Sequence, residues 1–239
     1  MELRVEGLAK SFGGLCVFTD VRFNLEPGGL MGVIGPNGAG KTTLINVISG
    51  RLAPSDGRVS LGGRDVTGQP AHVLSRLGVA RSFQQTNIFR SVSVRENIAR
   101  AIRFGRRGVQ PGFERLLDEF GLAERLDEQG DKLPYGLQKM LGLLMAFATG
   151  PHVLLLDEPA AGLERAERHR VDAFVQHARE TAGCSVLIIE HDMDLIRRLC
   201  PRVLVLDAGA VLADGATAEV LTRSDVIAAY LGGAEDAAA

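Results

Sequence analysis

The chain has no tryptophan, only two tyrosines and only three cysteines among its 239 residues. The cysteines, Cys16, Cys184 and Cys200, are odd in number and widely spaced, which excludes a disulfide framework and a paired metal-ligand pattern. We expect them to be reduced thiols. The first residues contain no basic stretch followed by an apolar run, so we expect no secretory signal and predict a cytosolic protein.

Long hydrophobic runs are also missing. Strongly apolar stretches such as residues 141–148 and 153–156 are well short of the roughly 18 to 20 residues that cross a bilayer. Charge is balanced, because 27 lysines and arginines oppose 29 aspartates and glutamates. A balanced chain has no overall attraction to nucleic acid or anionic lipid. We therefore expect no nucleic-acid partner, and any attachment to a membrane would be through another protein.

The chain does have the length and the apolar content, 46% of its residues, for one α/β domain with a substantial core. In its first third, alternating stretches at 3–6, 21–25 and 58–61 predict half-exposed strands of an antiparallel sheet. Between 91 and about 129 the pattern is helical, with a loop at 105–112 that contains glycine and proline. An antiparallel part is thus followed by a helical part.

The last third has the pattern of a parallel sheet. Continuous apolar runs at 153–156 and 186–189 are separated by a charged, helix-like stretch at 164–180, which is typical of βαβ units covered on both faces. A closing hairpin is predicted at 203–213. Residues 232–239 are predicted to form a frayed tail.

A glycine-rich segment fits the phosphate-binding pattern of Gly, four residues and Gly-Lys-Thr. Its residues are Gly35, Pro36, Asn37, Gly38, Ala39, Gly40, Lys41, Thr42 and Thr43. A predicted strand precedes it and an apolar helix face follows. Glycines let backbone N–H groups converge on phosphate oxygens, and the helix N-terminus adds partial positive charge. Lys41 would reach the β- and γ-phosphates of a bound nucleotide, and the Thr42 hydroxyl would bind Mg²⁺.

Two carboxylates follow a buried strand. The apolar residues 153–156 place Asp157 and Glu158 at the end of that strand, where open α/β sheets bind ligands. A solvated Asp-Glu pair at a strand end is ordinary, but combined with the phosphate loop it predicts a nucleotide site. Asp157 would hold Mg²⁺, directly or through water, and Glu158 would polarise the attacking water.

These motifs resemble those of the ABC ATPases, and further landmarks of that family follow in chain order over nearly the whole sequence. Residues 82–84 are similar to the Q-loop, residues 133–138 to the signature motif, and residues 188–192 to the switch region. A P-loop kinase or a small GTPase would need neither the segment 133–138 nor His191. The resemblance therefore favours an ABC ATPase over other phosphate-loop proteins.

The resemblance assigns roles to five further residues. Gln84 would contact Mg²⁺ or the attacking water and lie where a permease docks, and His191 would contact the γ-phosphate. Phe12 would stack on adenine. Leu133 and Gly136 would bind the ATP that a second chain holds. Taken singly, a glutamine after a strand, a histidine after a strand and an aromatic near a strand end are more often structural or solvated.

The predicted catalytic residues are Glu158, His191, Gln84 and Lys41. Within the family the sequence is most similar to the ATPases of branched-chain amino-acid uptake systems, on residues 10–14, 159–163 and 226–232. ATPases for urea or short amides and for lipopolysaccharide export share much of this pattern. The predicted cargo is therefore a branched-chain amino acid, with those cargoes as alternatives.

The signature segment and residue 164 depart from the family pattern. The signature usually reads Leu-Ser-Gly-Gly-Gln, but Pro134 replaces the serine and Leu137 the glutamine, which removes two polar contacts to ATP. The N–H of Gly136 and the following helix start can still bind phosphate. Glu164 stands where the family often has aspartate, so the contact that couples the two ATP sites of a dimer is expected to differ.

The predicted fold is an α/β P-loop NTPase of the ABC type. It would be a single domain over residues 1–239, with a mixed core sheet, an N-terminal antiparallel β subdomain, a helical signature subdomain at about 88–150 and a tail at about 232–239. The expected cofactors are ATP and Mg²⁺. The expected location is the cytoplasmic face of the cell membrane, as a peripheral subunit.

The expected partners are a second copy or a related ATPase, integral-membrane permease subunits, and a periplasmic or extracytoplasmic substrate-binding protein. A soluble ABC ATPase of translation or DNA repair is the alternative from another class. Such proteins usually join two ATPase domains or contain a long coiled coil, and neither is visible in this sequence. Transport is therefore the favoured function.

Overall fold

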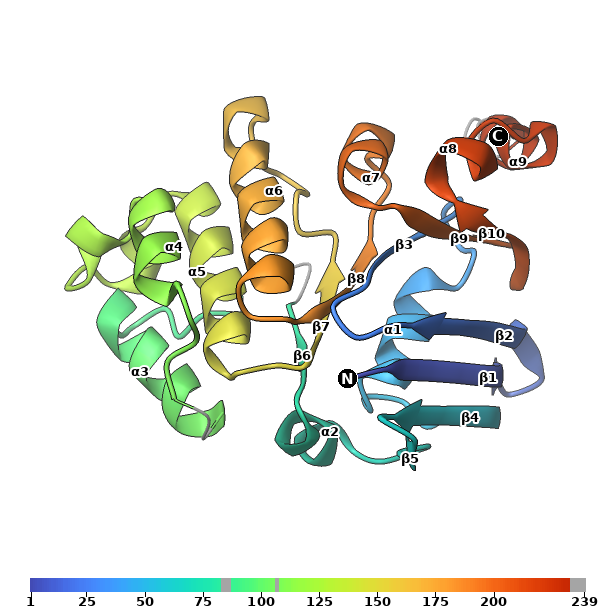
Figure 1. The fold of residues 1–239 in the computed structure, drawn as a ribbon, viewed down its shortest axis with the longest axis horizontal. Helices are drawn as coiled ribbons and strands as arrows, with labels where there is room; N and C mark the ends of the chain where they lie inside the picture. The colour runs from blue at the N-terminus through green and yellow to red at the C-terminus, as the bar shows by residue number, and fades with distance from the viewer. Residues whose placement is uncertain (83–86, 106–107, 233–239) are drawn as a thin grey trace.

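The computed structural model of the protein describes residues 1–82, 87–105 and 108–232. Within them, the larger of two β-sheets lies between a layer of helices and the smaller sheet (Figure 1). The smaller sheet is antiparallel, in the order β2-β1-β4-β5. Its strands are β1 (Leu3–Phe12), β2 (Leu15–Leu25), β4 (Asp56–Leu61) and β5 (Arg64–Asp65).

The larger sheet has the order β10-β9-β3-β8-β7-β6. Neighbouring strands from β9 to β6 are parallel, and β10 closes the sheet antiparallel to β9. Its strands are β3 (Leu30–Ile34), β6 (Val79–Arg81), β7 (Val153–Asp157), β8 (Ser185–Ile189), β9 (Arg202–Asp207) and β10 (Ala210–Ala216).

One of the described helices lies between the two sheets. It is α1 (Lys41–Ile48), which buries Leu44, Ile45 and Val47 there. The others described are α2 (Ala71–Leu77), α3 (Val94–Gly105), α4 (Phe113–Glu119), α5 (Tyr135–Ala148), α6 (Arg165–Glu180), α7 (Met193–Leu199), α8 (Thr217–Val220) and α9 (Ser224–Gly232). Two 3₁₀ turns, at Ala123–Arg125 and Gly130–Lys132, connect α4 to α5.

The continuous apolar runs in the sequence follow from a sheet that is covered on both faces. In β7, Val153 and Leu155 pack toward the smaller sheet, whereas Leu154 and Leu156 pack toward the helices. Successive side chains of a strand point to opposite faces, so both sets must be apolar. The two faces therefore carry two separate hydrophobic cores.

An aromatic cluster holds the helical layer together. The ring of Phe174 from α6 lies 6.1 Å from the ring of Phe120 and 5.9 Å from the ring of Phe147, which belongs to α5. All three rings are fully buried, and such tilted and edge-to-face pairs are favourable beyond their area. The cluster fixes α5 against α6, and so fixes the signature segment relative to β7.

The predicted fold class is confirmed, with an antiparallel N-terminal sheet and a mixed core sheet. Strands β1 and β2 are much longer than predicted, because the alternation covers only residues 3–6 and 21–25 whereas β1 has ten residues and β2 has eleven. The register of β1 against β2 shifts after Val5 and again after Leu8. Bulges of this kind break a period of two and so hide the rest of the strand from pattern analysis.

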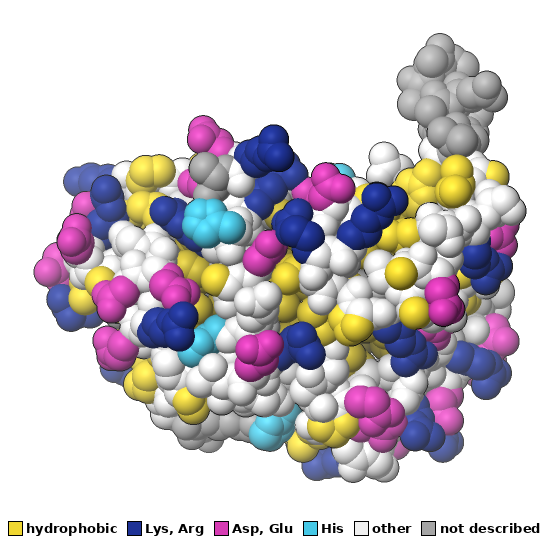
Figure 2. Space-filling view, turned by 45° about the horizontal axis from the view of Figure 1, so that its top comes forward, with side chains coloured by type: hydrophobic (Ala, Val, Ile, Leu, Met, Phe, Trp, Pro, Cys, Tyr) yellow, Lys and Arg dark blue, Asp and Glu magenta, His cyan; other side chains and the backbone are white. Residues whose placement is uncertain are grey.

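Among the described residues, we find no helix with the length and hydropathy needed to cross a membrane. Figure 2 shows basic and acidic side chains interspersed over one face, without a field of one sign. This matches the net charge of −2.

Candidate nucleotide-binding and hydrolysis site

Three neighbouring parallel strands end at the same edge of the larger sheet. The phosphate loop follows β3, His191 follows β8 and Glu158 follows β7, with β8 between the other two. Parallel pairing places all three carboxyl ends together, which is where open α/β sheets bind ligands. Residues from three distant parts of the sequence are thereby brought to one place.

The phosphate loop depends on a close approach of two backbones. A Cβ atom at Gly35 would lie 2.0 Å from the carbonyl oxygen of Leu206, and Gly35 has a φ of 153°. Any other residue would force β9 away from the loop. Gly40 has a φ of 98° and precedes α1, whose first turn carries no side-chain cap. Uncapped N–H groups of this kind can donate to phosphate.

The Lys41 ammonium is held inside the loop. Its Nζ donates to the carbonyl oxygens of Gly35, at 2.7 Å, and Pro36, at 2.9 Å. Burial lowers the pKa of Lys41, while the nearby Glu158 and Asp157 carboxylates oppose that shift. The ammonium thus lies beside both the loop and the two acidic groups, as phosphate binding between them requires.

Several other residues of the phosphate loop are more exposed to solvent than Lys41. Asn37 and Gly38 are exposed, whereas Ala39 is buried in the core between the sheets. Thr42 is exposed and Thr43 is half-buried, both in the first turn of α1.

The oxygen donors suit a magnesium ion that arrives with a nucleotide. Among the described residues, no group of three or more His, Cys, Asp and Glu side chains could hold a metal. Mg²⁺ is usually bound by one or two carboxylates plus substrate phosphates and water, with no all-protein cage. The Thr42 hydroxyl and the Asp157 carboxylate, at the start of α1 and the end of β7, fit that need.

Asp157 has a strong partner that sequence reasoning missed. Arg81, at the end of β6, donates to Asp157 Oδ2 at 2.7 Å, and both side chains are almost fully buried. The same guanidinium donates to Asn46 and Ser49 at the end of α1. Burial lowers the pKa of Arg81, and the bond to Asp157 opposes this. Arg81 therefore ties the acidic strand end to the helix of the phosphate loop.

Glu158 is held in an uncommon backbone conformation. Its φ is 47°, in the left-handed region that non-glycine residues rarely adopt. Its N–H donates to the carbonyl of Ile189 at 2.9 Å, and its carbonyl accepts from Lys139 Nζ at 2.7 Å. Its Oε1 lies 3.8 Å from His191 Nδ1. The predicted water-polarising group and the predicted γ-phosphate contact are thus side by side.

A second buried acid, Glu190, connects the loops that follow β7 and β8. Its Oε1 accepts from the Ala160 N–H at 2.9 Å and its Oε2 from the His191 N–H at 3.2 Å. It is 1% exposed, and burial raises its pKa while these N–H donors oppose the shift. Glu190 stood inside the predicted switch segment, but nothing in the sequence distinguished it from a solvated strand-end residue.

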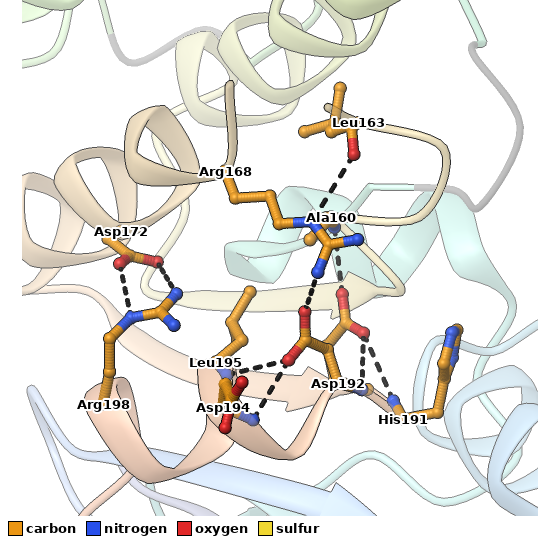
Figure 3. A network of polar contacts seen from close by, with 10 residues as sticks. Ala160, Leu163, Arg168, Asp172, His191, Asp192, Asp194, Leu195 and Arg198 are labelled. Carbon is orange, nitrogen blue, oxygen red and sulfur yellow. Dashed lines mark hydrogen bonds and ion pairs between the residues drawn. The ribbon is translucent and has the colours of Figure 1, made fainter. Parts of the chain in front are cut away.

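An ion pair continues this connection to the next helices (Figure 3). Arg168 of α6 pairs with Asp192 and donates to the carbonyl of Leu163. Asp192 in turn accepts from the N–H groups of Asp194 and Leu195 and so caps α7. The loop after β7, the switch and two helices therefore form one polar network.

The remaining predicted residues are not gathered at this edge. Phe12 is 47% exposed at the end of β1, with the Lys10 ammonium 4.7 Å from its ring centre, so a ring face is available for stacking. Leu133 and Gly136 lie at the start of α5, in the helical layer away from α1 (Figure 1). Gln84 lies outside the described residues.

The departures from the family signature have structural consequences. Pro134 precedes the first turn of α5 and accepts from the Gln138 N–H at 3.0 Å, while Leu137 is buried in the helical core. Glu164 forms a capping box with Glu167 at the start of α6. A Cβ atom at residue 136 would lie 2.0 Å from a Glu167 carboxylate oxygen, so glycine there makes room for that acid.

Comparison with known proteins defines the class. The profile of the ABC transporter family matches residues 18–161, more than half of the chain. The chain belongs to this family. The prediction that it is an ABC transporter ATPase is therefore confirmed.

Individual relatives of the chain have names that include a transported substrate. The chain is 36% identical to the high-affinity branched-chain amino acid transport ATP-binding protein LivG of Escherichia coli (strain K12), over 96% of this chain and 97% of that protein. It is 35% identical, with the same coverage, to the corresponding protein BraF of Pseudomonas aeruginosa. A solved ATP-binding cassette of an ABC transporter, in its ADP conformation, has 29% identity and a TM-score of 0.85 over 97% of this chain and 99% of that one.

The Arg81–Asp157 pair allows a prediction about stability. Arg81→Met leaves a buried carboxylate without this partner, and a broken buried pair costs about 3–5 kcal/mol. The double variant Arg81→Met/Asp157→Asn should lose clearly less than the sum of the two single losses. Urea unfolding without nucleotide measures the loss in free energy of unfolding for the two single variants and the double variant.

The exposed pair Arg95–Asp127 is the control, since its side chains are 60% and 87% exposed. Arg95→Met should cost no more than about 1 kcal/mol. Strictly additive losses in the Arg81 and Asp157 variants would show that the two groups do not stabilise each other.

Proposed function

We propose that the chain is the ATP-hydrolysing subunit of an importer of branched-chain amino acids. The observation that carries the chemistry is the convergence of Lys41, Asp157, Glu158 and His191 at the ends of β3, β7 and β8. The observation that supports the cargo is the likeness to LivG and BraF over 96% of the chain. ATPases for urea or short amides, or for lipopolysaccharide export, are the alternatives for the cargo.

The arrangement supports hydrolysis by a water molecule near Glu158. The loop amides and Lys41 would bind the phosphates, and Phe12 would stack on the adenine. Thr42, Asp157 and Gln84 would hold Mg²⁺, which would neutralise charge on the phosphates. Glu158 would orient the water and His191 would contact the γ-phosphate. The pre-set positions of these groups are what lower the barrier.

Two chains would share each nucleotide. Leu133 and Gly136 lie apart from the phosphate loop within one chain, so their proposed contact with ATP needs a second copy or a related ATPase. A head-to-tail pair with two-fold symmetry would place each signature over the partner's loop. ATP would then favour the closed pair, and loss of the γ-phosphate would favour its opening.

A groove beside the helical layer is the proposed permease contact. It has a volume of about 470 Å³, and its lining is mostly apolar, with Phe104 63% exposed and Phe89 48% exposed. Ser82 and Asn87, which flank the segment that contains Gln84, both line it. We therefore assign the groove to a helix of the integral-membrane permease. That contact would place the subunit on the cytoplasmic face of the membrane. The complete system would also include an extracytoplasmic substrate-binding protein.

The roles of Glu158 and Lys41 are tested by separating binding from turnover. Glu158→Gln should keep ATP affinity within about twofold but lower kcat by about 10²–10⁴-fold, because only the water-polarising group is lost. Lys41→Ala should lose nucleotide affinity itself. Nucleotide titration and phosphate release measure the two effects, and an equal loss of affinity in both variants would remove Glu158 from its assigned role.

The shared site is tested by mixing two damaged chains in a Glu158→Gln background. Lys41→Ala damages the loop, and Tyr135→Asp places a charge beside the partner's phosphates, a repulsion of about 1–4 kcal/mol. Tyr135 is 49% exposed in the first turn of α5, where an acidic residue does not harm the helix. Each variant alone should fail to dimerise with ATP.

In a mixed pair one site is intact, because an undamaged loop meets an undamaged signature. Light scattering should therefore show partial recovery of ATP-dependent dimers on mixing. Tyr135→Asn, which is neutral and similar in size to aspartate, should dimerise alone. No recovery from two folded variants would contradict the composite site.

The groove is tested by Phe104→Asp. A carboxylate buried against an apolar helix loses solvation without gaining a partner, so co-purification with co-expressed permease subunits in detergent should be lost. ATP hydrolysis by the isolated subunit should be unchanged. Ile227→Asp, an exposed apolar position on α9, is the control and should keep the permease. Retention of the permease by Phe104→Asp would exclude this groove as the contact.

A further inference from the structure

Lys139 is a buried lysine that none of the predicted roles uses. It is one of four lysines in the sequence and is 4% exposed, in the second turn of α5. Its Nζ donates to the carbonyl oxygen of Glu158 at 2.7 Å. A buried ammonium is costly unless it has an acceptor or a counter-charge, so this contact requires an explanation.

The contact is made to Glu158, whose backbone conformation is unusual for a residue other than glycine. Glu158 has a φ of 47°, and a non-glycine residue in the left-handed region persists only when its surroundings hold it there. Three hydrogen bonds do so. The N–H of Glu158 donates to the carbonyl of Ile189. The carbonyl of Glu158 accepts from the N–H of Ala161 at 3.2 Å and, at the shorter distance of 2.7 Å, from the charged Nζ of Lys139. The backbone conformation sets the direction of the side chain, so these bonds also aim the carboxylate.

The surrounding charges keep the ammonium where it is. Glu190, Glu158 and Asp157 all favour the charged form of Lys139, and they come from the ends of two strands. Burial opposes them and lowers the pKa of Lys139. Lys139 is thus a buried cation whose charged form is stabilised by the acidic groups of the site, and it is contributed by the signature helix of the same chain.

We propose that Lys139 is a positioning residue for Glu158, holding its carbonyl and thereby its side chain in the orientation for hydrolysis. The inference rests on the catalytic role of Glu158 proposed above. Lys139 also lines the groove assigned to the permease, together with Pro159, the residue that follows Glu158. The signature helix would thus fix the geometry of hydrolysis at the site of its own chain, in addition to its contact with the partner's ATP.

The experiment compares kcat and ATP affinity in Lys139→Met and Lys139→Arg. Methionine has a similar length but no donor, so kcat should fall about 10- to 100-fold, as for a small misplacement of a reacting group. ATP affinity should stay within about twofold, because no phosphate ligand changes. Arginine keeps a charged donor and should recover most of kcat. Lys132→Met, the same change at an exposed lysine, should have no effect.

The kcat of Glu158→Gln is measured in parallel. This distinguishes failure of the catalytic role of Glu158 from failure of the positioning role of Lys139. If Glu158→Gln hydrolyses ATP normally, the catalytic role of Glu158 fails, and the positioning role with it. If Glu158→Gln is inactive while Lys139→Met keeps its kcat, only the positioning role is overturned. A loss of ATP affinity that matches the loss of kcat in Lys139→Met, without rescue by arginine, would show a purely structural lysine.

Should Lys139→Met not fold, Lys139→Gln replaces it, because glutamine is polar but one atom too short to reach the Glu158 carbonyl. It should show the same selective loss of kcat, and an unchanged kcat would overturn the proposal. A crystal structure of either variant adds a direct readout. Residue 158 should leave the left-handed region, and an unchanged φ would also overturn the proposal.

Discussion

Parallel pairing of β3, β8 and β7 is the constraint on which the site depends. Gly32 is in register with Ile188, and Asp157 with Ile189, so the three strands end together. Each strand then delivers different chemistry: a loop of N–H groups, a histidine and a carboxylate. Both faces of the strands must be apolar to keep this register inside a covered sheet. The same hydrophobic packing that forms the core therefore sets the distances of the site.

The second organising feature is a set of opposed charges at this edge. The cations Lys41, Arg81 and Lys139 come from α1, β6 and α5, and they face the acidic groups Asp157, Glu158 and Glu190. Each buried charge needs a partner to offset its lost solvation. The three cations come from elements that pack on different sides of β7. The charges thus connect the two cores through the neighbouring strands β7 and β8, whose ends carry the acids.

Local sequence patterns predicted the parts of the site that are contiguous. The phosphate loop and the Asp157-Glu158 pair each follow an apolar run, and the carboxyl ends of neighbouring parallel strands lie together. His191 was assigned from the resemblance to the ABC ATPases. Arg81 and Lys139 could not be found in that way, because their partners are distant in sequence: Arg81 is 76 residues from Asp157 and Lys139 is 19 residues from Glu158. Their roles become visible only when β6 and α5 pack beside β7. The bulged half of β1 was missed for a local reason, since its register shifts erase the alternation.

The ion pairs of Figure 3 give the switch a mechanical consequence. Asp172 of α6 accepts from Arg198 of α7 at 3.0 and 3.3 Å, and Arg168 of α6 pairs with Asp192, which caps α7. Two attachments at separate points oppose rotation of one helix about the other. Under the proposed contact of His191 with the γ-phosphate, a displacement of His191 would therefore move α6 and α7 together, so that a change at the end of β8 would shift the surface that these two helices form.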